Sequence, residues 1–423
     1  LTQGSEQLEA LGEQLRHLEA AALATNGSLN ELGGSAAKRG EQLDAIGAAV
    51  THANEALDAA LRRFPYFLFV LRVGLFWYYL ERGDFSPRVH EEDRPVCAPL
   101  YNRGKKTPLF DISYYGRKIN LEVFHALTDG AGAFEFMRTI LYYYVTYRHP
   151  AQFQDEPPML DYDASTSHRK EDSFRRYGEK SMKFRNPRKA YWLRGTRPKP
   201  YRYRVIEGIA SCSELLKIAK ERGTTLTVLL SAYLMQAIYM DMPVRKRKYP
   251  VVLNVPVNLR KEFPSATARN FFSNAFTQYD FKNGPADLDS IIAKVAADFR
   301  AELSGARLSE RLNNQLALER NLLLRIAPLP LKNFAMRLAR NSAKKSETMV
   351  LSNVGRFPFD EKLSPFIELV DVFAGTPHMH LSICSYGDRL AMSFTSMMTE
   401  TDIQRNFFRL LTAQGLEVEI RSN

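Results

Sequence analysis

The sequence changes character abruptly near residue 54, and the two parts cannot share one kind of structure. Residues 1–55 contain no aromatic residue and no proline, whereas the remainder is rich in Phe and Tyr. Residues 1–55 also hold eight acidic and three basic residues, a net charge of −5, which leaves +16 on the rest of a chain whose total is +11. We therefore predict an N-terminal arm, residues 1–53, followed by a basic globular body.

Hydrophobic residues in the arm repeat every seven positions. The stronger row is Leu8, Leu15, Ala22, Leu29, Ala36, Leu43, Val50 and Leu57, and a weaker row follows three residues later. This spacing predicts a helical hairpin or a coiled coil. Four glycines between residues 26 and 40 each weaken a helix by about 1 kcal/mol relative to Ala, so we expect a break there. An amphipathic packing arm is the favoured interpretation, and oligomerisation through the arm is the alternative.

Strand and helix patterns alternate through the body. The run LFDISYYGRKINLEVFHA (109–126) predicts two strands joined by a tight turn, and Ala131–Tyr147 has helical spacing. Further strands are expected at 201–210, 249–260, 348–353, 379–386 and 389–397, and helices at 213–222, 224–240 and through much of 287–340. This alternation predicts the α/β class, with mixed sheets covered by helices in two lobes, 54–200 and 201–423.

Two apolar segments bear on membrane contact. Residues 64–80 (FPYFLFVLRVGLFWYYL) include Pro65 and Arg72 and fall short of the roughly 20 apolar residues of a spanning helix, so two adjacent buried strands are favoured. No transmembrane segment is predicted. Residues 322–340 are basic and amphipathic, which permits peripheral contact with a membrane surface. Two prolines interrupt them, and core packing is the favoured interpretation.

Cysteine usage and the chain's start suggest a compartment. Cys97, Cys212 and Cys384 lie far apart and form neither a metal-binding nor a disulfide-type motif. The first residues lack the basic-then-apolar pattern of a secretion signal. We therefore expect a cytoplasmic protein.

The sharpest local signal is VFHALTDGAGAFEFM (123–137). His125 leaves the end of an apolar strand, Asp129 follows four residues later, and Gly130 precedes a predicted helix. Such a corner can present an imidazole to a cleft while the carboxylate holds the backbone. Any His-Asp-Gly turn matches HxxxDG, however, so the motif alone favours an ordinary structural histidine.

Several separated motifs place this corner in a wider pattern. In chain order they are ALDAALRRFPYF (56–67), RVGLFWYYLE (72–81), YYGRKINLEVFHALTDGAGAFEFM (114–137), AYWLRGT (190–196), VPVNLR (255–260), LSNVGR (351–356) and SYGDRLAMSFT (385–395). On these motifs, residues 54–423 resemble the bacterial alcohol acetyltransferase-like branch of the chloramphenicol-acetyltransferase superfamily. That superfamily includes the condensation domains of peptide synthetases and the plant BAHD acyltransferases. The resemblance implies two lobes with the His125 corner at their interface.

The resemblance also implies a role for each matching residue. His125 matches the general base, Asp129 the structural carboxylate, and Gly130 the glycine that lets the chain turn into the helix. Arg260 of VPVNLR is the arginine we expect to hold Asp129, because a guanidinium fits a carboxylate bidentately. Phe124 stands where condensation domains often carry another histidine, and this departure argues against carrier-protein condensation.

The implied reaction transfers an acyl group from acyl-CoA to an alcohol. A neutral imidazole takes the hydroxyl proton, and the oxygen attacks the thioester carbonyl. One well-placed donor to the resulting oxyanion is worth about 3–4 kcal/mol. The candidate donors are Ser352 and Asn353 of LSNVGR and Tyr386 of SYG, and for each a strand-end hydrogen bond is the favoured alternative. Acyl-CoA is expected as a co-substrate, with no permanently bound cofactor.

Charge and histidine patterns add weaker signals. The basic body suits the phosphates of coenzyme A, and RKRK (245–248) is one candidate contact, although a solvated loop is favoured. Nucleic acid would suit the charge too, but no binding motif accompanies it and none is predicted. HMH (378–380) offers two imidazoles without a third ligand, so we predict a structural or cleft-lining role and no metal site.

One departure from the family leaves a second hypothesis open. In relatives the region before residue 56 supplies an opening strand of the first lobe, whereas here the heptad arm occupies these positions. We therefore expect an incomplete edge in the first sheet, which puts activity in question. The alternative function is a catalytically impaired or non-catalytic protein of this fold that acts as a scaffold through its arm.

Overall fold

The computed structural model describes residues 41, 44–153, 189–197, 202–265, 267, 269–343 and 345–423. The chain divides into two compact units, Leu1–Glu55 and Ala56–Asn423. Most of the predicted arm, 1–53, lies outside the described residues, and its described part, 44–53, is helical. The heptad hairpin and oligomerisation through it therefore stay predictions.

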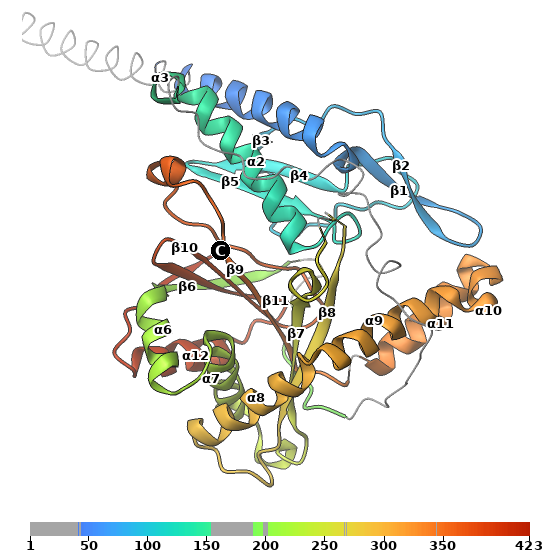
Figure 1. Ribbon diagram of the computed structural model, residues 1–423. Helices are drawn as coiled ribbons and strands as arrows, with labels where there is room; N and C mark the ends of the chain where they lie inside the picture. The colour runs from blue at the N-terminus through green and yellow to red at the C-terminus, as the bar shows by residue number, and fades with distance from the viewer. Residues whose placement is uncertain are drawn as a thin grey trace, which may run out of the picture. The chain divides into compact units, whose positions relative to one another are not determined.

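The second unit contains the sheets and most of the described helices (Figure 1). Its strands are β1 (Phe69–Val73), β2 (Tyr78–Arg82), β3 (His90–Glu91), β4 (Phe110–Tyr115), β5 (Lys118–Val123), β6 (Arg204–Ser211), β7 (Val251–Asn258), β8 (Phe272–Tyr279), β9 (Met349–Arg356), β10 (His380–Tyr386), β11 (Arg389–Ser396) and β12 (Glu419–Ser422). Its α-helices are α2 (Gly130–Arg148), α3 (Pro150–Phe153), α6 (Cys212–Glu221), α7 (Leu226–Asp241), α8 (Leu288–Glu302), α9 (Gly305–Arg320), α10 (Leu322–Ile326), α11 (Leu329–Ala343) and α12 (Asp402–Thr412). Residues 56–63 are also helical, and four short 3-10 turns are η1 (Pro65–Leu68), η2 (Val244–Lys246), η3 (Leu259–Lys261) and η4 (Glu361–Phe366).

A seven-stranded mixed sheet organises the C-terminal half. Its order is β12-β6-β11-β10-β9-β7-β8. β9 runs parallel to both β10 and β7, and the other neighbours are antiparallel. One face is apolar: Leu351 of β9 and Ile383 of β10 are fully buried in a core shared with α7. Helix α7 carries apolar residues around most of its circumference, as is typical of a helix enclosed by a core.

The opposite face of the same sheet is polar. Ser352 of β9, Ser382 of β10 and Ser393 of β11 lie side by side on it, because they pair in register and strand side chains alternate between faces. His380 shares this face two residues before Ser382. His380, Ser382 and Ser393 are nevertheless buried. Polar side chains withdrawn from water need hydrogen-bond partners, so this buried polar face is a candidate part of a functional site.

The N-terminal half contains a three-stranded sheet, β3-β4-β5, and a separate hairpin, β1–β2. β4 and β5 are antiparallel and turn at Gly116, whose φ of 55° suits glycine. Helix α2 packs through Phe136, whose ring stacks on Phe67 at 3.7 Å between centroids. Phe64 and Phe110 meet Phe136 edge to face. This aromatic cluster fixes α2, and with it the turn that holds His125.

Most of the strands and helices predicted for the body are confirmed. The strand pair at 109–126, the helix after it and the three strands between 348 and 397 all form. β8, β12 and α12 were not predicted from the sequence. Of these, α12 is strongly amphipathic and packs Phe407 against Phe394 of β11.

Two sequence predictions are wrong about burial. Residues 64–80 do contribute two adjacent strands, but the β2 residues Tyr78, Tyr79 and Leu80 are exposed rather than buried. Residues 322–340 form α10 and α11, on which Leu331 and Phe334 are each 60% exposed rather than packed in a core. Hydrophobicity alone does not distinguish a core segment from an exposed apolar surface. Among the described residues, no single helix has the length and hydropathy to cross a membrane. Helices α6 and α7 have the required length and hydropathy only when taken together, and they are bent by 86° at the break between them.

Candidate active site

His125 occupies the turn between β5 and α2. The Phe124 N–H donates to the Leu109 carbonyl (2.7 Å), and the Leu127 N–H donates to the Phe124 carbonyl (2.8 Å). The turn leaves His125 exposed, with its ring centroid 5.4 Å from that of Phe272 in β8. The imidazole therefore lies where the N-terminal half meets the seven-stranded sheet.

Asn270 holds His125 at two points. Its Nδ2 donates to the His125 carbonyl at 2.8 Å, and its Oδ1 lies 3.1 Å from His125 Nδ1. Because Nδ2 is committed to the carbonyl, Oδ1 faces the ring and can only accept. Nδ1 must therefore carry the hydrogen, which leaves Nε2 with a lone pair. This is the tautomer that a general base requires.

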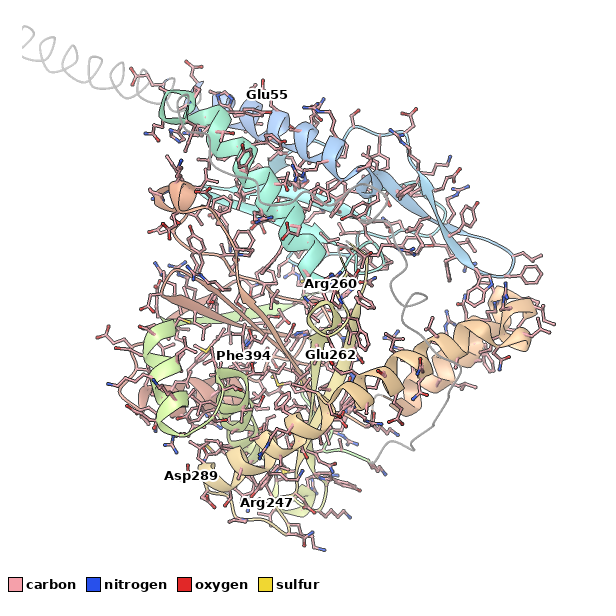
Figure 2. The ribbon with its side chains drawn as sticks, in the orientation of Figure 1. Glu55, Arg247, Arg260, Glu262, Asp289 and Phe394 are labelled. Carbon is pink, nitrogen blue, oxygen red and sulfur yellow. The ribbon has the colours of Figure 1, made fainter. Side chains whose placement is uncertain are left out.

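Asp129 and Arg260 form the bidentate ion pair expected from the motifs. Arg260 Nη1 donates to Asp129 Oδ2 at 2.8 Å, and Nη2 donates to Oδ1 at 3.2 Å. Asp129 is also the N-cap of α2, accepting from the Gly132 N–H at 3.1 Å. Figure 2 shows Arg260 beside the N-terminal end of α2. The pair thus joins the start of α2 to the residues that follow β7.

The same pair organises the loop that carries Asn270. Arg260 Nη2 donates to the carbonyls of Thr267 (3.0 Å) and Arg269 (2.7 Å). Asp129 Oδ2 accepts the Phe271 N–H at 2.8 Å. Asn270 is therefore held between two residues that are bonded to the ion pair. Asp129 acts on His125 through this loop and not by touching the imidazole.

His380 is a second imidazole beside the corner. It is 6% exposed, and neither of its ring nitrogens has a hydrogen-bond partner within the described part of the chain. Burial, together with the nearby charge of His125, lowers the pKa of His380 to about 4. On the next strand Val354 lies 3.7 Å from where a Cβ on Gly130 would stand, which places this sheet face against the start of α2. His380 is therefore a buried, neutral imidazole next to the corner.

The three candidate oxyanion donors have different surroundings. Ser352 lies on the sheet face that adjoins α2. Asn353 points to the other face, where its Nδ2 donates to Thr227 Oγ1 of α7 at 2.9 Å. Tyr386 is six residues beyond His380 on β10, or about 20 Å along the strand, and its ring packs against Phe357. Ser352 and Tyr386 therefore share the sheet face that adjoins α2, but Tyr386 lies farther along β10 from His380.

Tyr386 instead lines an open cavity of about 650 Å³ beyond the ends of β9 and β10, with Arg356, Phe357, Asp388 and Arg389. His125 is not part of its wall.

Gly130 does not show the role implied for it. Its φ is not positive, and an added Cβ would make only an ordinary contact with Val354 at 3.7 Å. The turn into α2 is made by residues 125–127 and capped by Asp129, so a glycine is not required for it.

The other histidine of HMH and the basic run 245–248 contact other residues. His378 precedes β10, and its Nε2 lies 3.5 Å from Glu347 Oε1. Within the described ranges no group of three or more His, Cys, Asp or Glu side chains could hold a metal. Of the basic run 245–248, Arg247 lies over the Tyr239 ring at 4.3 Å, well away from Arg260 in Figure 2.

Asn270 was not predicted from the sequence, and neither was the position of His380 on the polar sheet face beside the corner. Asn270 is 145 residues from His125 and belongs to no motif that the sequence analysis identified. A search for polar residues just after VPVNLR would have found it, because Arg260 must hold a nearby loop.

Comparisons with known proteins support the fold. No protein-family model matches the sequence, and no curated protein sequence matches it. Polyketide synthase associated protein 5 from Mycobacterium tuberculosis is similar in structure, with a TM-score of 0.55, 14% identity, and 86% of this chain and 89% of that chain covered. F. graminearum TRI101, solved with coenzyme A and T-2 mycotoxin, has a TM-score of 0.56 at 10% identity, covering 85% and 89%.

TRI3 trichothecene 15-O-acetyltransferase from Fusarium sporotrichioides has a TM-score of 0.50 at 14% identity, with 86% of each chain covered. These likenesses confirm the predicted α/β, two-lobed fold. At these identities they establish the fold alone.

Proposed function

We propose that this protein is an acyl-CoA-dependent O-acyltransferase that transfers an acetyl or other acyl group to an alcohol, with His125 as general base. The observation that carries the proposal is the pair of hydrogen bonds by which Asn270 holds His125. Asn270 fixes the hydrogen on Nδ1, and this leaves Nε2 as the proton acceptor on an exposed imidazole.

The reaction follows from this tautomer. Nε2 takes the proton of the acceptor hydroxyl as its oxygen attacks the thioester carbonyl, which gives a tetrahedral oxyanion. When the oxyanion collapses, the carbon–sulfur bond breaks, and the imidazolium returns the proton to the leaving thiolate. The products are the ester and free coenzyme A, and His125 is regenerated.

The surrounding residues support each stage. The Asp129–Arg260 pair keeps the loop that carries Asn270 in place, so His125 does not have to be oriented during the reaction. His380 stays neutral because of burial, so it adds no second positive charge beside the imidazolium. Ser352 is our candidate donor to the oxyanion, because its strand face adjoins the corner.

A thiol-release assay tests the proposal. Acetyl-CoA is mixed with a panel of short and long alcohols, and release of coenzyme A is followed with a thiol reagent. We expect alcohol-dependent release by the wild type, reduced by 10²- to 10⁴-fold in His125→Ala, which is the usual contribution of a general base. A matched control is His149→Ala, because His149 follows the 19-residue helix α2 and lies about 28 Å along it from the corner.

The outcomes are distinct. If thiol release falls equally in His125→Ala and His149→Ala, the loss reflects a structural effect of the substitutions, and His125 is not the general base. If wild type, His125→Ala and His149→Ala are all folded by circular dichroism but none releases thiol, the acyltransferase proposal is wrong. A scaffold of the same fold would then be the better hypothesis.

A further inference from the structure

The exposed apolar surface formed by α10, α11 and the β1–β2 hairpin has no part in the proposed chemistry. On α11, Leu331, Phe334 and Leu338 are separated by three and four residues, so they lie along one helix face. They are 60%, 60% and 55% exposed. Nearby on α10, Leu322 and Ile326 are exposed in the same way. Exposed apolar surface of this extent marks a site of interaction.

The hairpin is attached to these helices and adds aromatic residues. The Leu329 N–H donates to the Leu75 carbonyl at 2.8 Å. Lys332 Nζ donates to the Phe76 carbonyl at 2.8 Å and lies 3.5 Å from the centre of the Trp77 ring. Leu75 and Trp77 are themselves exposed. Figure 1 shows the tip of β1–β2 reaching the α10–α11 corner. We call these residues together the hairpin–helix surface.

The charge of the α10–α11 part of this surface is of one sign. Residues 321–343 contain four basic residues, Arg325, Lys332, Arg337 and Arg340, and no acidic residue. On a helical projection at 100° per residue, Lys332 and Arg337 fall on either side of the row Leu331, Phe334 and Leu338. An apolar row with basic residues at both edges is the arrangement of helices that lie in the interface of an anionic bilayer.

We infer that the hairpin–helix surface docks on a membrane containing anionic lipids. Leu331 and Phe334 would enter the acyl-chain boundary, Trp77 would lie at headgroup level, and Lys332 and Arg337 would contact lipid phosphates. The charge disfavours a second copy of this chain as the occupant. A two-fold interface would bring the same basic residues together without an acidic partner from 321–343. The inference does not rest on the proposed acyltransferase activity.

Vesicle co-sedimentation of the full chain tests the inference. The probes are phosphatidylcholine vesicles with and without phosphatidylglycerol. We expect binding only to the anionic vesicles, weakened by added salt. Leu331→Ser with Phe334→Ser should lower the partition coefficient at least tenfold, as should Lys332→Glu with Arg337→Glu. The matched control is Lys217→Glu with Lys220→Glu, two exposed lysines of α6.

Tryptophan fluorescence provides a local readout, because the chain has two tryptophans. In Trp192→Phe, Trp77 reports alone, and we expect its emission to shift to the blue when anionic vesicles are added. In Trp77→Phe, Trp192 reports alone, and no shift is expected.

Three results would overturn the inference. The first is absence of binding to anionic vesicles by the folded wild type. The second is an equal loss of binding in the α6 control, which would mean that net charge alone draws the protein to the vesicle. The third is a dimer, detected by sedimentation velocity without lipid, that Leu331→Ser with Phe334→Ser dissociates; this surface would then join two copies.

Discussion

A single side-chain amide selects the reactive nitrogen of His125. Asn270 accepts from Nδ1 and donates to the carbonyl of the same residue, so the ring cannot flip without breaking a hydrogen bond. The Asp129–Arg260 pair holds the loop on either side of Asn270. At the scale of residues, then, a buried ion pair sets the chemistry of an exposed imidazole through one intermediate residue.

Replacing Asn270 with Ala tests this arrangement. With no acceptor at Nδ1, we expect the neutral imidazole to populate both tautomers, and kcat to fall about 10- to 100-fold while KM for acetyl-CoA changes little. The measurement is steady-state kinetics together with ¹⁵N NMR of the His125 ring, which separates the two tautomers. Asn283→Ala, in an exposed turn after β8, is the matched control. An unchanged ring spectrum in Asn270→Ala would refute the positioning role.

Among the elements, strand β6 carries the most unusual group of the sheet. Glu207 is 6% exposed and accepts from Ser393 Oγ of β11 at 3.0 Å. Burial and then the adjacent carboxylate of Asp371 raise the pKa of Glu207 to about 7. Asp371 Oδ2 also lies 3.5 Å from Lys118 Nζ, at the start of β5. This cluster therefore connects the seven-stranded sheet with the N-terminal sheet.

The raised pKa predicts how stability depends on pH. Between its ordinary value of 4.5 and about 7, folded Glu207 binds more protons than unfolded Glu207. Its contribution to the free energy of unfolding therefore falls as pH rises through this window and is constant above it. Glu207→Gln mimics the protonated acid, so we expect it to raise the free energy of unfolding at pH 8 by up to about 3 kcal/mol and leave it unchanged near pH 4.

Urea unfolding at a series of pH values measures this effect. Glu221→Gln, at an exposed position at the end of α6, is the control and should follow the wild type. A Glu207→Gln variant that is less stable than the wild type at pH 8 would contradict the prediction.

At the scale of the whole molecule, the boundary between the two units lies inside a helical segment. Residues 56–63 are helical, and Leu57 and Leu61 are 0% and 7% exposed. Phe64, directly after them, is fully buried against Phe136 of α2. The start of the second unit is therefore part of its core, although in sequence it continues the heptad row.

Two truncations test this boundary. Deletion of residues 1–53 should leave the Tm of the second unit within a few degrees of the wild type. Deletion of 1–63 also removes two buried leucines, each worth about 2–5 kcal/mol, and should lower Tm strongly or prevent folding. Calorimetry of both proteins measures the difference. Equal loss of Tm in the two truncations would place the boundary before residue 53.

The His125 corner and its arginine were predictable because they belong to local patterns. His125, Asp129 and Gly130 follow a strand signal and precede a helix signal. The pairing of Arg260 with Asp129 was implied by the resemblance of the motifs to a known family, and the two side chains do pair. The proximity of Asn270 and His380 to His125 could not be predicted from local patterns. Asn270 belongs to a loop and His380 to β10, and both are far from His125 along the chain. Burial of 73–80 and of most of 322–340 was predicted wrongly, because periodicity shows which residues share a face but not what covers it.

The sequence by itself determined the α/β class and the order of most elements, because backbone preferences and side-chain periodicity act over a few residues. It also placed His125 and Asp129 between a strand and a helix, whereas their roles were implied by the family resemblance. The tertiary structure alone decided which sheet face adjoins α2, which nitrogen of His125 is free, and that α11 presents its apolar row outward. These depend on contacts between segments that are distant in sequence: His125 and Asn270, for example, are 145 residues apart. Folding brings such groups together by burying apolar surface elsewhere, and no local pattern records the result.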